Sequence, residues 1–152
     1  MAAYQGGGGG VMFVSRTKLQ ALAQAKLDDA VLLLKHNRCG NAYYLSGYAL
    51  ELGFKAAACK LFLAECLPDR NLVQSLYQQG HDLKTLTGLA GISKAFEDAR
   101  AADPLLQVNW STTSQWSVAS RYEMIDEFKA VEMVNAVADA EHGVLRWLKN
   151  HW

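Results

Sequence analysis

The sequence predicts an all-α fold: an antiparallel up-and-down helical bundle with three or more main helices and short extra helices. The main observation is that apolar residues recur every three or four positions in several stretches, which is the spacing of one helical face. A second is that no stretch alternates apolar and polar residues over enough positions to predict a strand. The third is a composition of 51% hydrophobic and 20% charged residues, which in 152 residues suffices for one substantial core.

The first residues differ from the rest in composition. Residues 1–14 include five consecutive glycines, and fixing such a backbone carries a large entropic cost. Residues 1–10 also lack the basic and apolar regions of a signal peptide. We therefore predict a flexible Gly-rich leader over 1–14, whose apolar end from Val11 to Val14 packs on the bundle, and a single helical domain over 15–152.

The first helix is predicted to end at about Lys35, where its apolar face stops. Ser15 or Thr17 is its expected N-cap, because a hydroxyl accepts hydrogen bonds from first-turn amides. The segment 36–40 breaks the pattern, and Gly40 suits a helix end or a tight turn. So short a connection makes the first two helices antiparallel neighbours.

The second helix is the one around which the chain is predicted to be organised. Apolar residues recur at helical spacing from Asn41 to about Cys66, which predicts a helix roughly 39 Å long at 1.5 Å per residue. Beside them runs an aromatic and charged stripe, formed by Tyr44, Tyr48, Glu51 and Lys55. A helix of this length cannot bury itself, so other helices must flank it.

Short helices are predicted next. Asp69 is the expected cap of a helix that stops at Gly80, and Asp82 is the expected cap of the helix that follows. A further helical face around Phe96 must close before Asp103–Pro104, since the residue before a proline disfavours the α region.

The last third of the chain is predicted to hold an ordered loop and one long helix. Leu105 to Ser120 contains Ser, Thr, Asn and two tryptophans without a clean period, which predicts a loop that buries these rings. From about Ile125 the helical spacing returns, and it predicts a helix that reaches almost to the C-terminus.

Charge and cysteine content exclude several classes of protein. Fifteen basic residues balance fifteen acidic ones, so no overall charge attracts nucleic acid or an anionic membrane, although a local patch remains open. No apolar run reaches the roughly 20 residues that span a bilayer. Three cysteines without CxxC spacing predict reduced thiols in a cytoplasmic protein. His36 and His142 lack neighbours at metal-ligand spacing, so neither a metal site nor a cofactor is predicted.

A family resemblance enters at the second helix. Ala42-Tyr-Tyr-Leu-Ser-Gly-Tyr-Ala-Leu-Glu-Leu-Gly-Phe-Lys-Ala56 resembles the second-helix signature of HEPN domains (higher eukaryotes and prokaryotes nucleotide-binding), which reads roughly A-x-Y-L-x-G-Y-A-x-E-x-x-x-K-A. The resemblance extends to His81-Asp82-Leu83 after this helix and to Arg121-Tyr122 before the last one. It covers most of the chain from Thr17 to Trp152.

The resemblance implies a fold and a setting. HEPN domains are antiparallel helical bundles that often form dimers, in prokaryotes often beside a minimal nucleotidyltransferase in a toxin–antitoxin or defence pair. Many are metal-independent ribonucleases with an R-x4-6-H motif. At the family position this chain has Arg121-Tyr-Glu-Met-Ile-Asp-Glu-Phe without a histidine, so it resembles the branch that keeps the fold without the catalytic pair.

The candidate site is a groove for a nucleotide or a partner protein along the second helix. Tyrosine offers a stacking face and lysine a phosphate contact, whereas the structural alternative is a solvated Glu51–Lys55 helix pair. Arg121 is expected to pair with Glu51 or with a ligand phosphate. Trp110 and Trp116 either stack on bases or pack the loop. The predicted groove residues are Tyr44, Tyr48, Glu51, Lys55, His81, Asp82, Arg121 and Tyr122.

Two other functions stay open. One is a metal-independent ribonuclease that uses Arg146 and His151, the only pair with the R-x4-6-H spacing. About 0.5 matches to so short a motif are expected by chance, and two side chains five positions apart on a straight helix diverge by roughly 140°. The other is an accessory domain that presents substrate to a separate nucleotidyltransferase. The first hypothesis is a binding module without catalysis.

Overall fold

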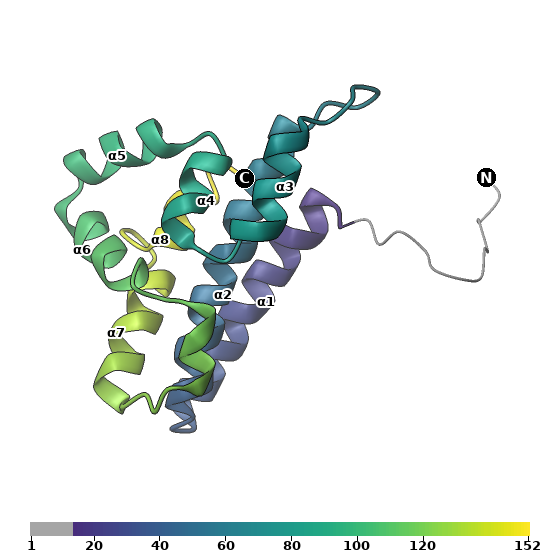
Figure 1. Ribbon diagram of the computed structural model, residues 1–152. Coiled ribbons are helices and arrows are strands. Elements are labelled where there is room, and N and C mark those ends of the chain that lie inside the picture. Colours follow the sequence, from purple (N-terminus) through teal and green to yellow (C-terminus); the bar gives the residue numbers. More distant parts are fainter. Residues whose placement is uncertain (1–13) are drawn as a thin grey trace, which may run out of the picture.

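The computed structural model describes residues 14–152 and confirms the all-α prediction: within this range it has eight α-helices and no strand (Figure 1). The predictions for the leader fall outside the described residues, except at Val14, which is exposed. No helix of this range is long and apolar enough to cross a membrane. The elements are α1 (Arg16–Lys35), α2 (Cys39–Ala58), η1 (Cys59–Leu61), α3 (Arg70–Gln79), α4 (Leu83–Leu89), α5 (Ser93–Ala102), α6 (Pro104–Thr113), η2 (Val118–Tyr122), α7 (Glu127–Ala138) and α8 (Val144–Leu148).

Helices α1 and α2 form the predicted antiparallel pair (Figure 1). Ser15 is the N-cap of α1, and its hydroxyl accepts from the amide of Lys18 at 3.2 Å. The prediction that Gly40 makes the turn is wrong. Asn37 takes the left-handed conformation there, with φ of 56°, and Gly40 lies in the first turn of α2. Asparagine tolerates this backbone because its side chain bonds locally.

Helix α2 occupies the centre of the fold. It contacts α1, α4, α7, α8 and η2, and 13 of its 20 residues are buried. Phe54, in its C-terminal half, lies with its ring 6.3 Å from that of Phe96 and 6.1 Å from that of Trp110. Burial of these aromatic side chains supplies much of the hydrophobic stabilisation of the core.

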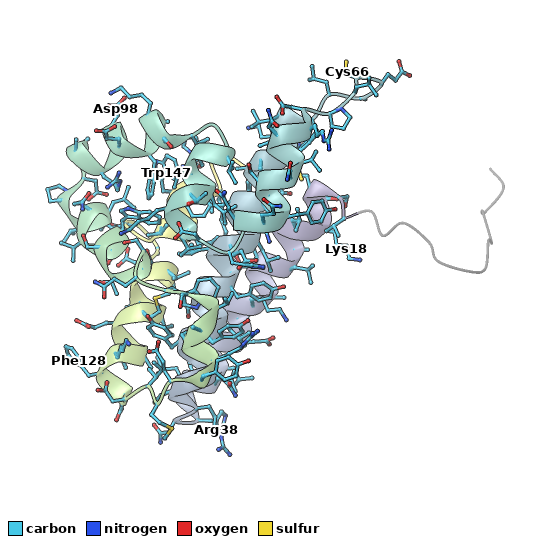
Figure 2. The ribbon with its side chains drawn as sticks, viewed as in Figure 1. Lys18, Arg38, Cys66, Asp98, Phe128 and Trp147 are labelled. Atoms are coloured by element: carbon cyan, nitrogen blue, oxygen red, sulfur yellow. The ribbon has the colours of Figure 1, made fainter. Side chains whose placement is uncertain are left out.

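The predicted end of the second helix at Cys66 is wrong, because α2 stops at Ala58 and a short 3-10 turn follows. Helices α1 and α2 each have 20 residues, so α2 ends where its antiparallel partner begins. Beyond that point Leu63 and Cys66 are exposed. Their helical spacing has no helix to pack on, and packing is what stabilises most helices in proteins. Figure 2 shows Cys66 in a loop that projects from the body.

Two more of the predicted caps are confirmed, and Asp103, predicted only to end a helix, also begins one. Asp69 accepts from the amide of Leu72, and Asp82 accepts from the amide of Thr85 at 2.7 Å. Asp103 closes α5 as expected, but its carboxylate also caps the next helix. The predicted loop from Leu105 to Ser120 is therefore wrong, since α6 begins at Pro104, and proline suits the first position of a helix.

The predicted long C-terminal helix is also wrong, because a turn divides it into α7 and α8. The Asp139 carboxylate accepts from the amides of Glu141 and His142. At Gly143 a Cβ atom would come within 2.4 Å of the Asp139 carbonyl oxygen, so only glycine fits. The turn folds α8 back against α2, where Leu148 packs beside Gly53.

Glycine is also required inside α2, at a close contact with a tryptophan. A Cβ atom on Gly47 would lie 2.2 Å from the indole ring of Trp116, which is buried. The missing side chain lets this ring lie against the helix backbone. A helical glycine costs about 1 kcal/mol relative to alanine, so this packing offsets a poor helix residue.

We expect Gly47→Ala to lower the free energy of unfolding by about 1–3 kcal/mol, because overpacking a core forces side chains and backbone apart. Gly40→Ala is the matched control. A Cβ there meets nothing within 4 Å, so the better helix residue should leave stability unchanged or raise it. Urea denaturation measures both variants. A Gly47→Ala protein as stable as Gly40→Ala would contradict the Trp116 contact.

An ion pair joins the start of α6 to the turn between α7 and α8. His142 Nδ1 lies 2.8 Å from Asp103 Oδ2, and the Asn109 amide donates to the His142 carbonyl at 2.9 Å. The hydrogen bond with Asp103 raises the pKa of His142 above 6.5, and Asp139 and Glu141 add to the effect. The same bond lowers the pKa of Asp103 below 3.8.

These two pKa shifts define the pH range over which the Asp103–His142 pair stabilises the fold. The contribution of His142 is complete below its unfolded pKa and is lost as pH rises through the raised folded value. The stabilisation from Asp103 is present above the pKa that this residue has in the unfolded chain. It is lost as pH falls through the lowered pKa of the folded state. For His142→Gln we expect the loss of melting temperature to be largest near about pH 5 and smaller at alkaline pH. His36→Gln is the control, and a loss that does not vary with pH would contradict the pair.

Candidate ligand-binding face of α2

The eight residues predicted for the groove come from three segments that meet along α2. Tyr44, Tyr48, Glu51 and Lys55 lie on α2 itself. The start of α4 and the short helix η2 both contact α2, and they bring the remaining four (Figure 1). These four are all exposed, and they are His81, Asp82, Arg121 and Tyr122.

Glu51 is at the centre of this face and its side chain is only 2% exposed. Its Oε1 accepts from Lys55 Nζ at 2.8 Å and lies 3.0 Å from His81 Nδ1. Its Oε2 is buried and has no hydrogen-bond partner. The Glu51–Lys55 helix pair is therefore present, but it is not solvated, because the Glu51 carboxylate is buried and depends on hydrogen-bond partners within the fold.

The expected Arg121–Glu51 pair is wrong as well, since Arg121 lies near the N-terminal end of α2, beside Tyr44 and Tyr122. Its guanidinium carbon is 5.0 Å from the centre of the Tyr122 ring. The hydroxyl of Tyr122, and then that of Tyr44, raises the pKa of Arg121. Among residues 14–152 Arg121 forms no ion pair with a carboxylate.

Stacked aromatic rings connect the part of the face around Glu51 with the part around Arg121. The rings of Tyr44 and Tyr48 are nearly parallel at 6.2 Å, and the ring of Trp116 lies 5.8 Å from that of Tyr44. Burial, and then the charge of Glu51, raises the pKa of the Tyr48 hydroxyl. Trp116 is 3% exposed, which confirms the packing interpretation of this residue and removes it as a stacking surface for bases.

A groove opens where α2 begins. It has a volume of about 420 Å³ and lies between the connection from α1 to α2 and the segment from η2 to α7. Arg38 and Arg121 line it from opposite sides, together with Glu123, which pairs with Lys129 at 3.3 Å. Figure 2 shows Arg38 at the end of the molecule opposite the Cys66 loop.

The first turn of α2 supplies hydrogen-bond donors to this groove. Arg38 is the N-cap residue, but its side chain makes no capping hydrogen bond. Cys39, Gly40 and Asn41 line the groove. Because the first amides of a helix have no partner within it, they attract negative charge. Arg38 was missed as a site residue, although its place in a basic turn just before a helix was a usable signal.

The structure does not bring Arg146 and His151 together in a common site. Arg146 is exposed, and its Nη1 donates to Asn150 at 3.4 Å. The His151 ring stacks on Trp147 at 3.9 Å, and its Nδ1 lies 3.2 Å from the Trp147 carbonyl oxygen. No hydrogen bond joins the two residues in the described chain.

Comparison with family models, curated proteins and solved structures finds no match to this chain. The HEPN resemblance therefore stays a prediction that rests on its motif residues. Within residues 14–152 no three His, Cys, Asp or Glu side chains lie together as metal ligands would.

Burial of Glu51 generates a stability prediction. We expect Lys55→Met to lower the free energy of unfolding by about 1–3 kcal/mol, because the buried carboxylate loses a charged partner. Lys94→Met is the matched control, since Lys94 has the same i,i+4 spacing from Asp98 but both side chains are exposed. It should cause no measurable change. Equal effects of the two changes in chemical denaturation would contradict the role of Glu51 described above.

Proposed function

We propose that this chain is a HEPN-like helical module that binds the phosphates of a nucleotide or RNA in the groove at the start of α2. The observation that supports it most is the pair Arg38 and Arg121. Both line a groove of about 420 Å³, and neither has a carboxylate partner in the described residues. Arginine matches phosphate through paired N–H donors, and the amides of the first turn of α2 add further donors.

Aromatic side chains beside the groove favour a nucleic acid over a simple anion. Tyr122 is 80% exposed next to Arg121, and Tyr44 is half-buried on the same side. A base can stack on an exposed tyrosine while its phosphate meets the arginines, and such stacking tolerates different bases. The overall charge of zero means that binding depends on this local patch alone.

The HEPN resemblance also suggests where the protein acts and which partners it has. It suggests a cytoplasmic prokaryotic protein, a homodimer, and a partner such as a minimal nucleotidyltransferase in a toxin–antitoxin or defence pair. Exposed apolar side chains next to the groove support a protein contact at the same end, notably Met124 and Phe128, which are 101% and 71% exposed. Sedimentation of the purified chain tests the dimer, and a monomer at all concentrations would remove it.

The groove is tested by RNA binding to the Arg38→Gln/Arg121→Gln double variant. With a fluorescein-labelled single-stranded RNA we expect binding to weaken at least tenfold at low salt. The slope of log affinity against log salt should fall by roughly 1 to 1.5, because two phosphate contacts are lost. Anisotropy measures both quantities.

The matched control is Arg16→Gln/Arg70→Gln, which removes the same charge from two exposed positions outside the groove. It should bind RNA like the unmodified protein. Equal weakening in both double variants would show that net charge, and not the groove, determines binding. Loss of RNA cleavage in His151→Ala, with binding retained, would instead favour the ribonuclease.

A further inference from the structure

A second cavity lies between α4, α5 and α6, far from the groove at the start of α2 (Figure 1). Its volume is about 290 Å³, which is at the lower end for ligand sites and so suits a small molecule. Lys84 and Thr87 line it from α4, and Ser93, Glu97 and Arg100 line it from α5. None of these residues belongs to the proposed nucleic-acid site.

The lining of this cavity has a charge that nothing in the fold neutralises. Lys84 and Arg100 contribute two positive charges and Glu97 one negative charge, which leaves one positive charge. None of the three forms an ion pair among residues 14–152. A ligand with a single negative charge balances this lining, whereas a phosphate dianion would leave it negative.

Arg100 is held in a fixed position. Its Nη1 donates to Gln107 Oε1 at 2.9 Å, and its guanidinium carbon lies 4.9 Å from the ring centre of Phe96 and 5.8 Å from that of Trp110. Its Nε is buried and has no hydrogen-bond partner. A buried donor without a partner is unfavourable. A carboxylate at this edge of the guanidinium accepts from Nε and the adjacent Nη together, after a small shift of the side chain.

The other walls offer a ligand little, because their rings are covered within the fold and their hydroxyls are hydrogen-bonded to each other. Phe96 and Trp110 are both buried and meet edge to face at 4.8 Å. Thr87 Oγ1 donates to the Lys84 carbonyl, and Ser93 Oγ lies 3.3 Å from Thr87 Oγ1. Because the Thr87 proton is in use, the Ser93 hydroxyl is the donor to Thr87 Oγ1, and neither hydroxyl has a second proton for a ligand.

We propose that this cavity binds a small organic carboxylate, held by Arg100 and Lys84. The site is separate from the RNA groove and does not depend on it. Glu97 lies in the same lining and repels the ligand, so it limits affinity.

The test is a benzoate titration of the full chain, followed by amide shifts in NMR spectra. We expect saturable shifts in residues 84–100 with a dissociation constant on the order of 1 mM, as suits so small a ligand. Benzamide, which has nearly the same shape without the charge, should bind at least tenfold more weakly. Inorganic phosphate should also bind more weakly than benzoate. Equal shifts with benzoate and benzamide, or no saturable shift at all, would overturn the proposal.

Substitutions in the lining of this cavity test whether benzoate binds there. Arg100→Gln and Lys84→Gln should each weaken benzoate binding several-fold, and Glu97→Gln should strengthen it. Lys84 is exposed, so its replacement reports on binding even if the Arg100 change disturbs the core. Lys94→Gln is the control, because it removes a positive charge from α5 outside the lining and should leave binding unchanged. Unchanged binding in both the Lys84 and Arg100 variants would overturn the assignment.

Discussion

Burial of α2 on nearly every side is the constraint on which the rest of the structure depends. A helix covered by α1, α4, α7, α8 and η2 must present small residues where its neighbours come closest, which explains Gly47 under Trp116 and Gly53 under Leu148. It can also hold almost no charge. Glu51 is the exception, and it is the only charged side chain of residues 14–152 that is buried.

The buried carboxylate ties the connection between α3 and α4 to the centre of the fold. Because an isolated buried charge is strongly unfavourable, Lys55 and His81 must both stay close to Glu51. His81 lies just before α4, so its contact fixes where that helix begins. In this account the stripe on α2 is mainly a structural device. Its polar groups become available to a ligand only towards the N-terminal end of the helix, where Arg121 and Tyr122 lie.

The sequence predicted the features that depend on local chemistry. Ser15, Asp69 and Asp82 act as caps because their side chains bond amides three residues away, and this needs no tertiary information. The pairing of α1 with α2 follows from a short connection. Of the eight residues predicted for the groove, four share α2, but only Arg121 lines the groove at the start of that helix.

The predictions that failed depended either on contacts between distant segments or on local signals that the helical pattern hid. The helical spacing up to Cys66 does not reveal that α1 begins only at Arg16, beside the end of α2 at Ala58. The division between α7 and α8 depends on Asp139 bonding its own turn, and the helical pattern hid it. From the sequence we predict only the end of a helix at Asp103–Pro104, although an acidic cap followed by proline is also typical of the start of a helix. The place of Arg38 in the groove and the burial of Glu51 were not predicted, because both depend on which elements pack around α2.

The most direct test of the account is an amide NMR titration of the unmodified protein with a short single-stranded RNA. If the exposed start of α2 is the binding site, the largest shifts will be in Cys39, Gly40 and Asn41 and in the facing segment around Arg121. The amides in the buried middle of α2 should then hardly change. Shifts centred on the C-terminal segment from Arg146 to His151, with none at the start of α2, would contradict it.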